Sequence, residues 1–224
     1  MKVKAMLMKF VKILAVLVIV AAIVRSGPMA NAAVNSGVKT ANTETSASGV
    51  VKNFYAVLTD VMKQGDKLGF SGREKKLAPA VRNAFNLPLM TRFAVGPVWQ
   101  QATESEQNQL ISAFSDFSVA TYASRFAKYE GERFEVLGQK PASGGGVIVE
   151  TRLTPGGENA DPVALNYLLR QDDKGSWRIV DVFLDGAISE LATRRSEFTS
   201  IVQRDGIPAL VNSLGEKSRQ MGPS

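Results

Sequence analysis

Apolar residues recur at helical spacing in three segments between residues 50 and 130. Residues 51–63 place Val51, Phe54 and Leu58 on one face, and residues 73–85 have a similar pattern despite a proline at position 79. The longest pattern covers residues 103–129 and opens on a Thr-x-x-Glu sequence with the spacing of a capping box. These patterns predict three helices.

The segment between the second and third of these helices, residues 86–101, is apolar but contains Pro88 and the pair Gly96-Pro97. Proline removes a backbone donor and interrupts helical hydrogen bonding, so one straight helix is excluded. We expect short helical turns that fold over a core.

After residue 132 the spacing of apolar residues changes from helical to alternating, which is typical of strands. The alternating runs are residues 134–138, 147–153, 163–169 and 177–184. Two further helical patterns, residues 188–203 and 207–217, close the chain. Helices, then strands, then helices predict an α+β fold, with helices packed on one face of a four-stranded antiparallel sheet.

The first 32 residues have the features of a secretory signal peptide. Four lysines precede an apolar run at residues 13–24, and Ala30-Asn31-Ala32 places small residues before a cleavage site. The run is shorter than the roughly 20 residues of a spanning helix, and an uncleaved N-terminal anchor is the alternative. We expect an exported chain with a signal at residues 1–32, a flexible leader at 33–49, one folded domain at 50–219 and a tail at 220–224.

Removing the signal changes the charge balance. The first 32 residues hold five basic and no acidic residues, which leaves 22 of the 27 basic residues against all 21 acidic ones. The exported domain therefore lacks the basic excess of a nucleic-acid-binding protein. The chain has no Cys and no His, which excludes disulfides, thiol nucleophiles, imidazole bases and typical zinc sites.

Asp181 is the carboxylate for which a catalytic role has to be weighed. It lies in the predicted strand 177–184, on the face shared with Trp177, Ile179 and Phe183. A buried carboxylate with a raised pKa can act as the general base of a small-molecule enzyme. The alternative, which we favour, is a structural hydrogen bond to a neighbouring backbone group or arginine.

Arginines near apolar segments are candidates for binding a lipid head group or a partner, because a guanidinium can bind a phosphate through two hydrogen bonds. These candidates are Arg92, Arg152, Arg170 and Arg195. The alternative role of each is to cover apolar surface with its methylene groups. The large apolar side chains are equally open to two interpretations, a lined cavity or the filled core of a structural adaptor protein.

The order of several motifs resembles the MlaC-like "toluene tolerance" family of periplasmic phospholipid carriers. Residues 85–99 read FNLPLMTRFAVGPVW and precede a Thr-x-x-Glu-capped helix, as in that family, and residues 177–181 resemble the family's Trp-x-x-x-Asp strand. The resemblance covers residues 50–217, and the FNLPLMTRFAVGPVW segment is most similar to the branch associated with hopanoid biosynthesis.

The resemblance implies a periplasmic lipid carrier without enzymatic activity or cofactor, whose cargo is a phospholipid or a hopanoid. It implies an NTF2-like lobe and a helical lobe that enclose an apolar pocket for the lipid tails. The implied partners are an inner-membrane lipid ABC transporter complex and an outer-membrane lipoprotein complex. The residues expected to line the pocket are Leu89, Phe93, Val98, Trp99, Phe114, Phe117, Tyr122, Val149, Leu165, Tyr167 and Ile188.

The signal peptide generates the first testable prediction. Cleavage after Ala32 gives an exported protein that begins at Ala33, and N-terminal sequencing of the exported protein checks this. An intact chain that starts at Met1 in the membrane fraction would instead support the anchor.

Overall fold

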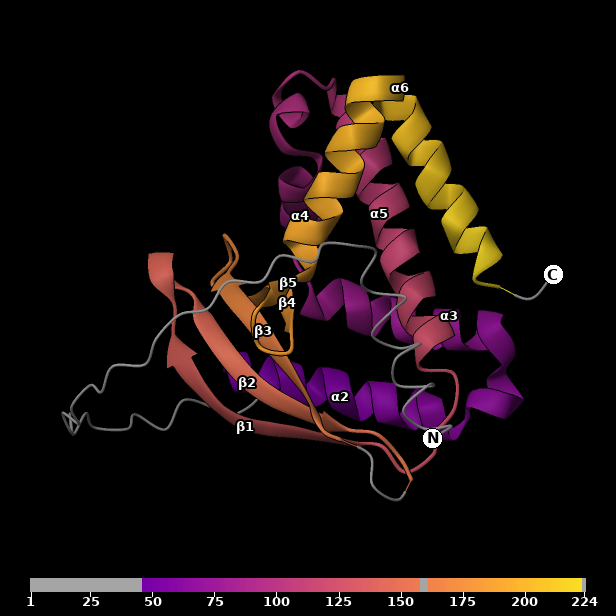
Figure 1. Ribbon diagram of the computed structural model, residues 1–224, viewed down its shortest axis with the longest axis vertical. Helices are drawn as coiled ribbons and strands as arrows, with labels where there is room; N and C mark the ends of the chain where they lie inside the picture. The colour runs from indigo at the N-terminus through magenta and orange to yellow at the C-terminus, as the bar shows by residue number, and fades with distance from the viewer. Residues whose placement is uncertain (1–45, 158–160, 223–224) are drawn as a thin grey trace. The chain divides into compact units, whose positions relative to one another are not determined.

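The computed structural model describes residues 46–157 and 161–222 (Figure 1). The predicted signal peptide lies outside the described residues, as do residues 33–45 of the predicted leader and the last two residues of the predicted tail. Within the described ranges, no helix combines the length and the apolar character that crossing a membrane requires.

The domain begins with two consecutive helices, α2 (Ala47–Lys63) and α3 (Gly65–Ala84). The Ser46 side chain caps α2 by accepting a hydrogen bond from the Gly49 amide at 3.0 Å. Residues 47–49 are therefore helical, and Ala47 and Gly49 are buried, whereas we had assigned these residues to the leader. The leader boundary was drawn too late because small residues give no helical pattern.

Helix α3 is longer than the predicted segment 73–85, and it contains a break at Gly69, where φ is 60° and ψ is −176°. Pro79 lies inside the helix at an exposed position. Water can replace the hydrogen bond that this proline cannot donate, so the helix continues through it.

The apolar segment after α3 forms the short helix α4 (Leu87–Val95) and the 3-10 turn η2 (Gly96–Gln100). Asn86 caps α4 by accepting a hydrogen bond from the Leu89 amide at 3.1 Å. Pro88 lies in the first turn, where an amide needs no partner within the helix, so it starts the helix and does not interrupt it. Gly96 ends α4 with a φ of 72°. The expected short turns are confirmed, with only Gly96-Pro97 acting as a break.

Helix α5 (Glu104–Arg125) starts with the predicted capping box. The Glu106 amide donates to Thr103 Oγ1 at 3.3 Å, and the Thr103 amide donates to Glu106 Oε2 at 2.8 Å. The helix ends before the predicted residue 129, because Phe126 leaves helical geometry (φ −106°, ψ 55°). The Phe126 ring stacks on Tyr122 at 5.8 Å between ring centres and contacts Phe134 at 5.9 Å. These contacts turn the chain toward the sheet.

The sheet has five antiparallel strands in the order of the chain. They are β1 (Arg133–Pro141), β2 (Val147–Thr154), β3 (Val163–Gln171), β4 (Trp177–Leu184) and β5 (Ile188–Ser189). The prediction of four strands missed β5, because a strand of two residues gives no alternating pattern. Bulges interrupt the regular pairing of β1 at Leu137 and of β4 at Val180.

The last helix, α6 (Glu190–Gln220), breaks at Gly206, where φ is 84° and ψ is 174°. Residues 190–205 are called here the first half of α6, and residues 207–220 the second half. Both halves are drawn beside α5 in Figure 1, and α6 packs against α5. The predicted break between residues 203 and 207 is confirmed, but Ile188 belongs to β5 and not to the helix.

The helices gather on one side of the sheet in Figure 1, which confirms the α+β class. Helix α2 contacts β1, β2 and β4, while α3, α4 and α6 each contact β4. The inner face of the sheet, with Val149, Tyr167 and Ile179, joins the helices in one apolar core. Arg152 and Ala164, which pair with each other on the opposite face, are exposed.

Replacing Gly206 with alanine tests the break in α6. The backbone at this position has angles that almost only glycine adopts, and alanine there costs about 1–3 kcal/mol. Gly206→Ala is expected to lower the free energy of unfolding in urea by this amount.

Gly215→Ala is the matched control, because Gly215 lies in the regular part of the same helix. A Cβ there would meet only the end of the Arg219 side chain at 3.4 Å. Alanine is expected to raise stability by about 0.5–1 kcal/mol. Equal losses from the two variants would contradict a special role for Gly206.

Candidate functional site

The inner face of the sheet forms an apolar surface that several elements share. Val149, Tyr167 and Leu169 are at most 2% exposed there, and Leu165 is 9% exposed. Helix α2 lies across this face and buries Phe54, Tyr55 and Leu58 against it. We treat this layer, called the sheet–helix interior below, as the candidate site for an apolar ligand.

Aromatic rings connect the elements around the sheet–helix interior. Phe54 of α2 contacts Phe85 and Tyr122 edge to face, with ring centres 5.3 and 5.1 Å apart. Tyr55 contacts Phe134 of β1 at 4.8 Å and Tyr167 of β3 at 5.7 Å. Such pairs stabilise beyond the area that they bury, so this network holds α2, α5 and the sheet together.

The polar groups of the sheet–helix interior are hydroxyls that bind one another. Tyr55 Oη lies 2.7 Å from Thr151 Oγ1, and the Thr151 hydroxyl donates to the Leu165 carbonyl. Burial raises the pKa of Tyr55 to about 12 and also raises the pKa values of Tyr122 and Tyr167. All three phenols are therefore neutral at physiological pH, and they place no charge in the sheet–helix interior.

A groove of about 480 Å³ opens to the surface between α2 and β1. Tyr55, Phe134 and Val136 form its apolar wall, while Lys52 and Lys63 provide its charged side. The groove thus shares Tyr55 and Phe134 with the aromatic network. A second hollow of about 350 Å³ lies between α3 and α5 and is lined mainly by polar residues such as Ser71, Glu74 and Asp116. None of the residues predicted to line a lipid pocket borders either hollow of the described chain.

The structure brings together only part of the predicted lining. Val149, Leu165, Tyr167 and Tyr122 meet in the sheet–helix interior. The other predicted aromatics of α5 lie elsewhere: Phe114 contacts Phe198 of α6 at 5.9 Å between ring centres. Phe117 of α5 lies beneath Arg194, as described below.

The remaining predicted residues lie on and around α4. Val98 and Trp99 are partly buried against the core, and Leu89 is half-buried on α4. The prediction that Phe93 and Ile188 line the pocket is wrong, because their side chains are 51% and 52% exposed and do not face the interior. The family resemblance placed Phe93 in the pocket lining, but it could not tell whether another element covers this residue.

The four predicted arginines do not form one site. Arg92 is exposed on α4, and Arg195 is exposed on the first half of α6. Arg152 lies on the outer face of the sheet. Arg170 donates to the Gly144 carbonyl at 2.9 Å and to the Ser143 carbonyl at 3.2 Å, so it holds the β1–β2 hairpin in place.

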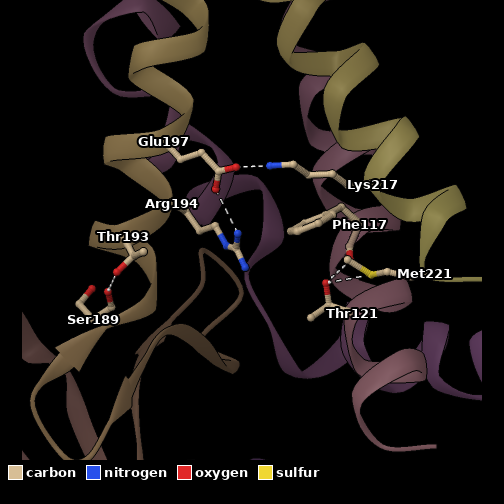
Figure 2. A network of polar contacts seen from close by, with 8 residues as sticks. All are labelled: Phe117, Thr121, Ser189, Thr193, Arg194, Glu197, Lys217 and Met221. Atoms are coloured by element: carbon tan, nitrogen blue, oxygen red, sulfur yellow. Dashed lines mark hydrogen bonds and ion pairs between the residues drawn. The ribbon is translucent and has the colours of Figure 1, made fainter. Parts of the chain in front are cut away.

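The prediction missed a row of partly buried charges between α5 and α6. Arg194 lies 5.0 Å from the centre of the Phe117 ring and pairs with Glu197 at 3.2 Å. Figure 2 shows how Glu197 also reaches Lys217 of the second half of α6. The spacing of Arg194 and Glu197, three residues apart on a predicted helix, was the available signal.

Two further charges extend this row toward the sheet. Burial lowers the pKa of Arg125 and raises the pKa of Glu190, although each also faces opposite charge. Glu190 Oε1 is buried and has no hydrogen-bond partner in the described chain. The charges of this region therefore lie mainly between helices, and Arg125 and Glu190 interact with Tyr122 of the sheet–helix interior.

Asp181 has a structural role and lies on the other face of β4 from the one predicted. The bulge at Val180 pairs Ile179 with Leu169 on the inner face and Asp181 with Leu168 on the outer face. The carboxylate accepts hydrogen bonds from the Val182 amide at 2.8 Å, the Ser189 hydroxyl at 2.6 Å and the Leu191 amide at 3.0 Å. These bonds use both oxygens to hold β5 and the start of α6.

Acidic side chains do not gather into a metal site either. Within residues 46–157 and 161–222, no group of three or more Asp or Glu side chains is placed to hold a metal ion. The candidate site is therefore an apolar one.

Comparison with known proteins gives a consistent result. A family model described as "MlaC protein" matches residues 52–216. A phospholipid-binding protein from Ralstonia solanacearum, solved in complex with a phospholipid, has a similar structure with a TM-score of 0.66 and 22% sequence identity. The match covers 78% of this chain and 98% of that one. At this identity the similarity establishes the fold. No curated protein matches the sequence.

Replacing Asp181 with alanine distinguishes the structural role from a catalytic one. The substitution leaves three donors without their acceptor in a region where Asp181 is only 7% exposed. Asp181→Ala is expected to lower the free energy of unfolding by at least about 2 kcal/mol in urea.

Asp173→Ala is the control, since Asp173 is exposed in the β3–β4 turn. It is expected to change stability by less than about 0.5 kcal/mol. Unchanged stability in Asp181→Ala, together with loss of a measurable enzymatic turnover, would support the general-base interpretation.

Proposed function

This chain belongs to the MlaC protein family, and on that premise we propose that it is a periplasmic lipid carrier. It binds a phospholipid or a hopanoid and moves it between an inner-membrane lipid ABC transporter complex and an outer-membrane lipoprotein complex. It performs no chemical reaction on its cargo. The phospholipid bound to the Ralstonia solanacearum protein of the same fold supports a phospholipid as cargo.

The observation that carries the proposal is the composition of the sheet–helix interior. Its walls are apolar side chains and aromatic rings from α2, α5 and three strands, and its hydroxyls are neutral because burial raises their pKa values. Such walls can replace water around an acyl chain without removing a charge from solvent. A chain of about a dozen methylene groups would otherwise lose roughly 10 kcal/mol on transfer into water.

Loading requires the side chains of this interior to separate, because they pack against one another in the present structure. Three glycines with positive φ divide the helical cover into shorter rods: Gly69 (60°), Gly96 (72°) and Gly206 (84°). Backbone rotation at these positions moves a rod without unfolding it. We propose that such rearrangement admits the lipid tails between the helices and the inner face of the sheet.

The charged row between α5 and α6 suits the polar end of the cargo. Arg125 and Arg194 are partly buried cations that face Glu190, whose Oε1 has no hydrogen-bond partner. A head group that displaces Glu190 from these guanidiniums would gain charge-assisted hydrogen bonds. This assignment replaces the predicted group of four arginines, which are dispersed over the surface.

Mass spectrometry of molecules that copurify with the native protein tests the proposal. We expect a phospholipid or a hopanoid, released only after denaturation or extraction with organic solvent. Leu165→Trp places a large ring in the sheet–helix interior, so the variant is expected to lose the lipid. Because the interior is packed in the present structure, the variant is also expected to lose about 1–3 kcal/mol of stability from overpacking.

Ala164→Trp is the matched control, since Ala164 is exposed on the opposite face of the same strand. It is expected to keep the lipid. A wild-type protein that never holds lipid would reject the carrier in favour of a filled core.

A further inference from the structure

A second surface of the domain lies where α4 and the first half of α6 pack side by side (Figure 1). We call the exposed residues Arg92, Phe93, Pro97 and Arg195 the α4–α6 face. The two helices meet at Gly96, where a Cβ would lie 3.5 Å from Arg195 Nε. The Arg195 guanidinium therefore lies against the end of α4, one turn from Phe93.

The α4–α6 face carries two arginines that form no ion pair within the described chain. Residues 86–103 contain one charged residue, Arg92, and Arg195 is the only charged residue among the exposed positions of residues 192–203. In the described chain neither arginine has an ion pair or a hydrogen bond through its side chain. The nearby acids are engaged elsewhere, since Glu197 pairs with Arg194 and Lys217, and Asp205 pairs with Arg204.

An exposed aromatic ring belongs to the same face, since Phe93 follows Arg92 in the chain and precedes Gly96 by one turn. Phe93 is 51% exposed, although α4 buries its neighbours Ala94 and Val95 completely. A ring that enters the boundary between head groups and acyl chains, flanked by guanidiniums that reach lipid phosphates, is typical of proteins that bind membrane surfaces. The two hollows described above lie elsewhere, one between α2 and β1 and one between α3 and α5, and neither groove borders this face. A fluid bilayer requires no such groove.

We propose that the α4–α6 face docks this protein on the surface of an anionic lipid bilayer. The docking does not depend on what the sheet–helix interior holds. One arginine near an anionic surface strengthens binding about fivefold, and insertion of one aromatic side chain adds about tenfold. Binding is therefore weak and reversible, and it falls with salt because the arginines are exposed.

The test is cosedimentation with vesicles of phosphatidylcholine, with or without phosphatidylglycerol. The protein is used in the form that accumulates in its host, so that all variants share one N-terminus. The wild type is expected to bind vesicles that contain phosphatidylglycerol and to dissociate when salt is added. Arg92→Gln combined with Arg195→Gln is expected to weaken this binding about 25-fold, and Phe93→Ser about tenfold.

Two control variants make the same kinds of substitution at exposed residues outside the α4–α6 face. Arg152→Gln removes an exposed arginine from the outer face of the sheet, and Leu137→Ser removes a side chain that is 54% exposed on β1. Both are expected to bind vesicles like the wild type. Circular dichroism and urea unfolding confirm that each variant is folded.

Three results would overturn the proposal: a wild type that ignores anionic vesicles, face variants that bind normally, or controls that lose binding equally. If the wild type does not bind vesicles but forms a crosslink to a membrane protein, and Phe93→Ser loses that crosslink, the face belongs to a protein partner. Copurified lipid without vesicle binding would reject the docking and leave the carrier standing. Vesicle binding by a protein that never holds lipid would support the docking and reject the carrier.

Discussion

The middle of strand β4 holds the starts of two helices, and the arrangement of the helical cover depends on these bonds. The Ile179 carbonyl accepts a hydrogen bond from the Asn86 amide at 2.8 Å, immediately before α4. Two residues later the Asp181 carboxylate accepts the Ser189 hydroxyl and the Leu191 amide, at the start of α6. Because one short stretch of strand positions both helices, α4 and α6 meet each other in a defined place. The surface that they share is a consequence of this common attachment.

The domain separates neutral polar groups from charged ones. Hydroxyls such as those of Tyr55 and Thr151 lie in the sheet–helix interior, where hydrogen bonds among them avoid an unpaired polar atom. Arg194, Glu197 and Lys217 lie between helices, where opposite charges are close and part of each side chain reaches water. An ionised group on the inner face of the sheet would lose solvation without a partner. Because charged groups are kept away from it, the inner face of the sheet can contact apolar groups.

Local signals in the sequence predicted most of the fold, and features of pairing between distant segments were missed. The capping box of Thr103 and Glu106 lies within one turn, so the start of α5 could be placed from the residues alone. The bulge at Val180 exists only because β3 pairs with β4, and no property of the Asp181 neighbourhood signals it. The predicted face of Asp181 was wrong for this reason.

Only part of the candidate site could be predicted, because a strand pattern defines its buried face better than a helix pattern does. Periodicity identified Tyr167 and Val149 as one side of a buried sheet, because alternation along a strand has only two faces. A helix offers a continuous range of directions, and its packing partners decide which of them are covered. Phe93 was therefore assigned to the interior although it lies on the surface. The charged row was missed because it joins residues from both halves of a helix that folds back at Gly206.

The bulge at Val180 also changes which positions of β4 face the core, from odd numbers before it to even numbers after it. Ile179 before the bulge and Val182 after it both face the core, although an odd and an even position of a regular strand lie on opposite faces. Deleting Val180 would leave Leu168 paired with Asp181 and Tyr167 paired with Val182, so the strand would become regular and the later side chains would keep their faces. Deleting one residue after the bulge would instead turn every later side chain of the strand to the opposite face. Among related chains, natural length variation in this region should be confined to the bulge itself and to the turns on either side of β4.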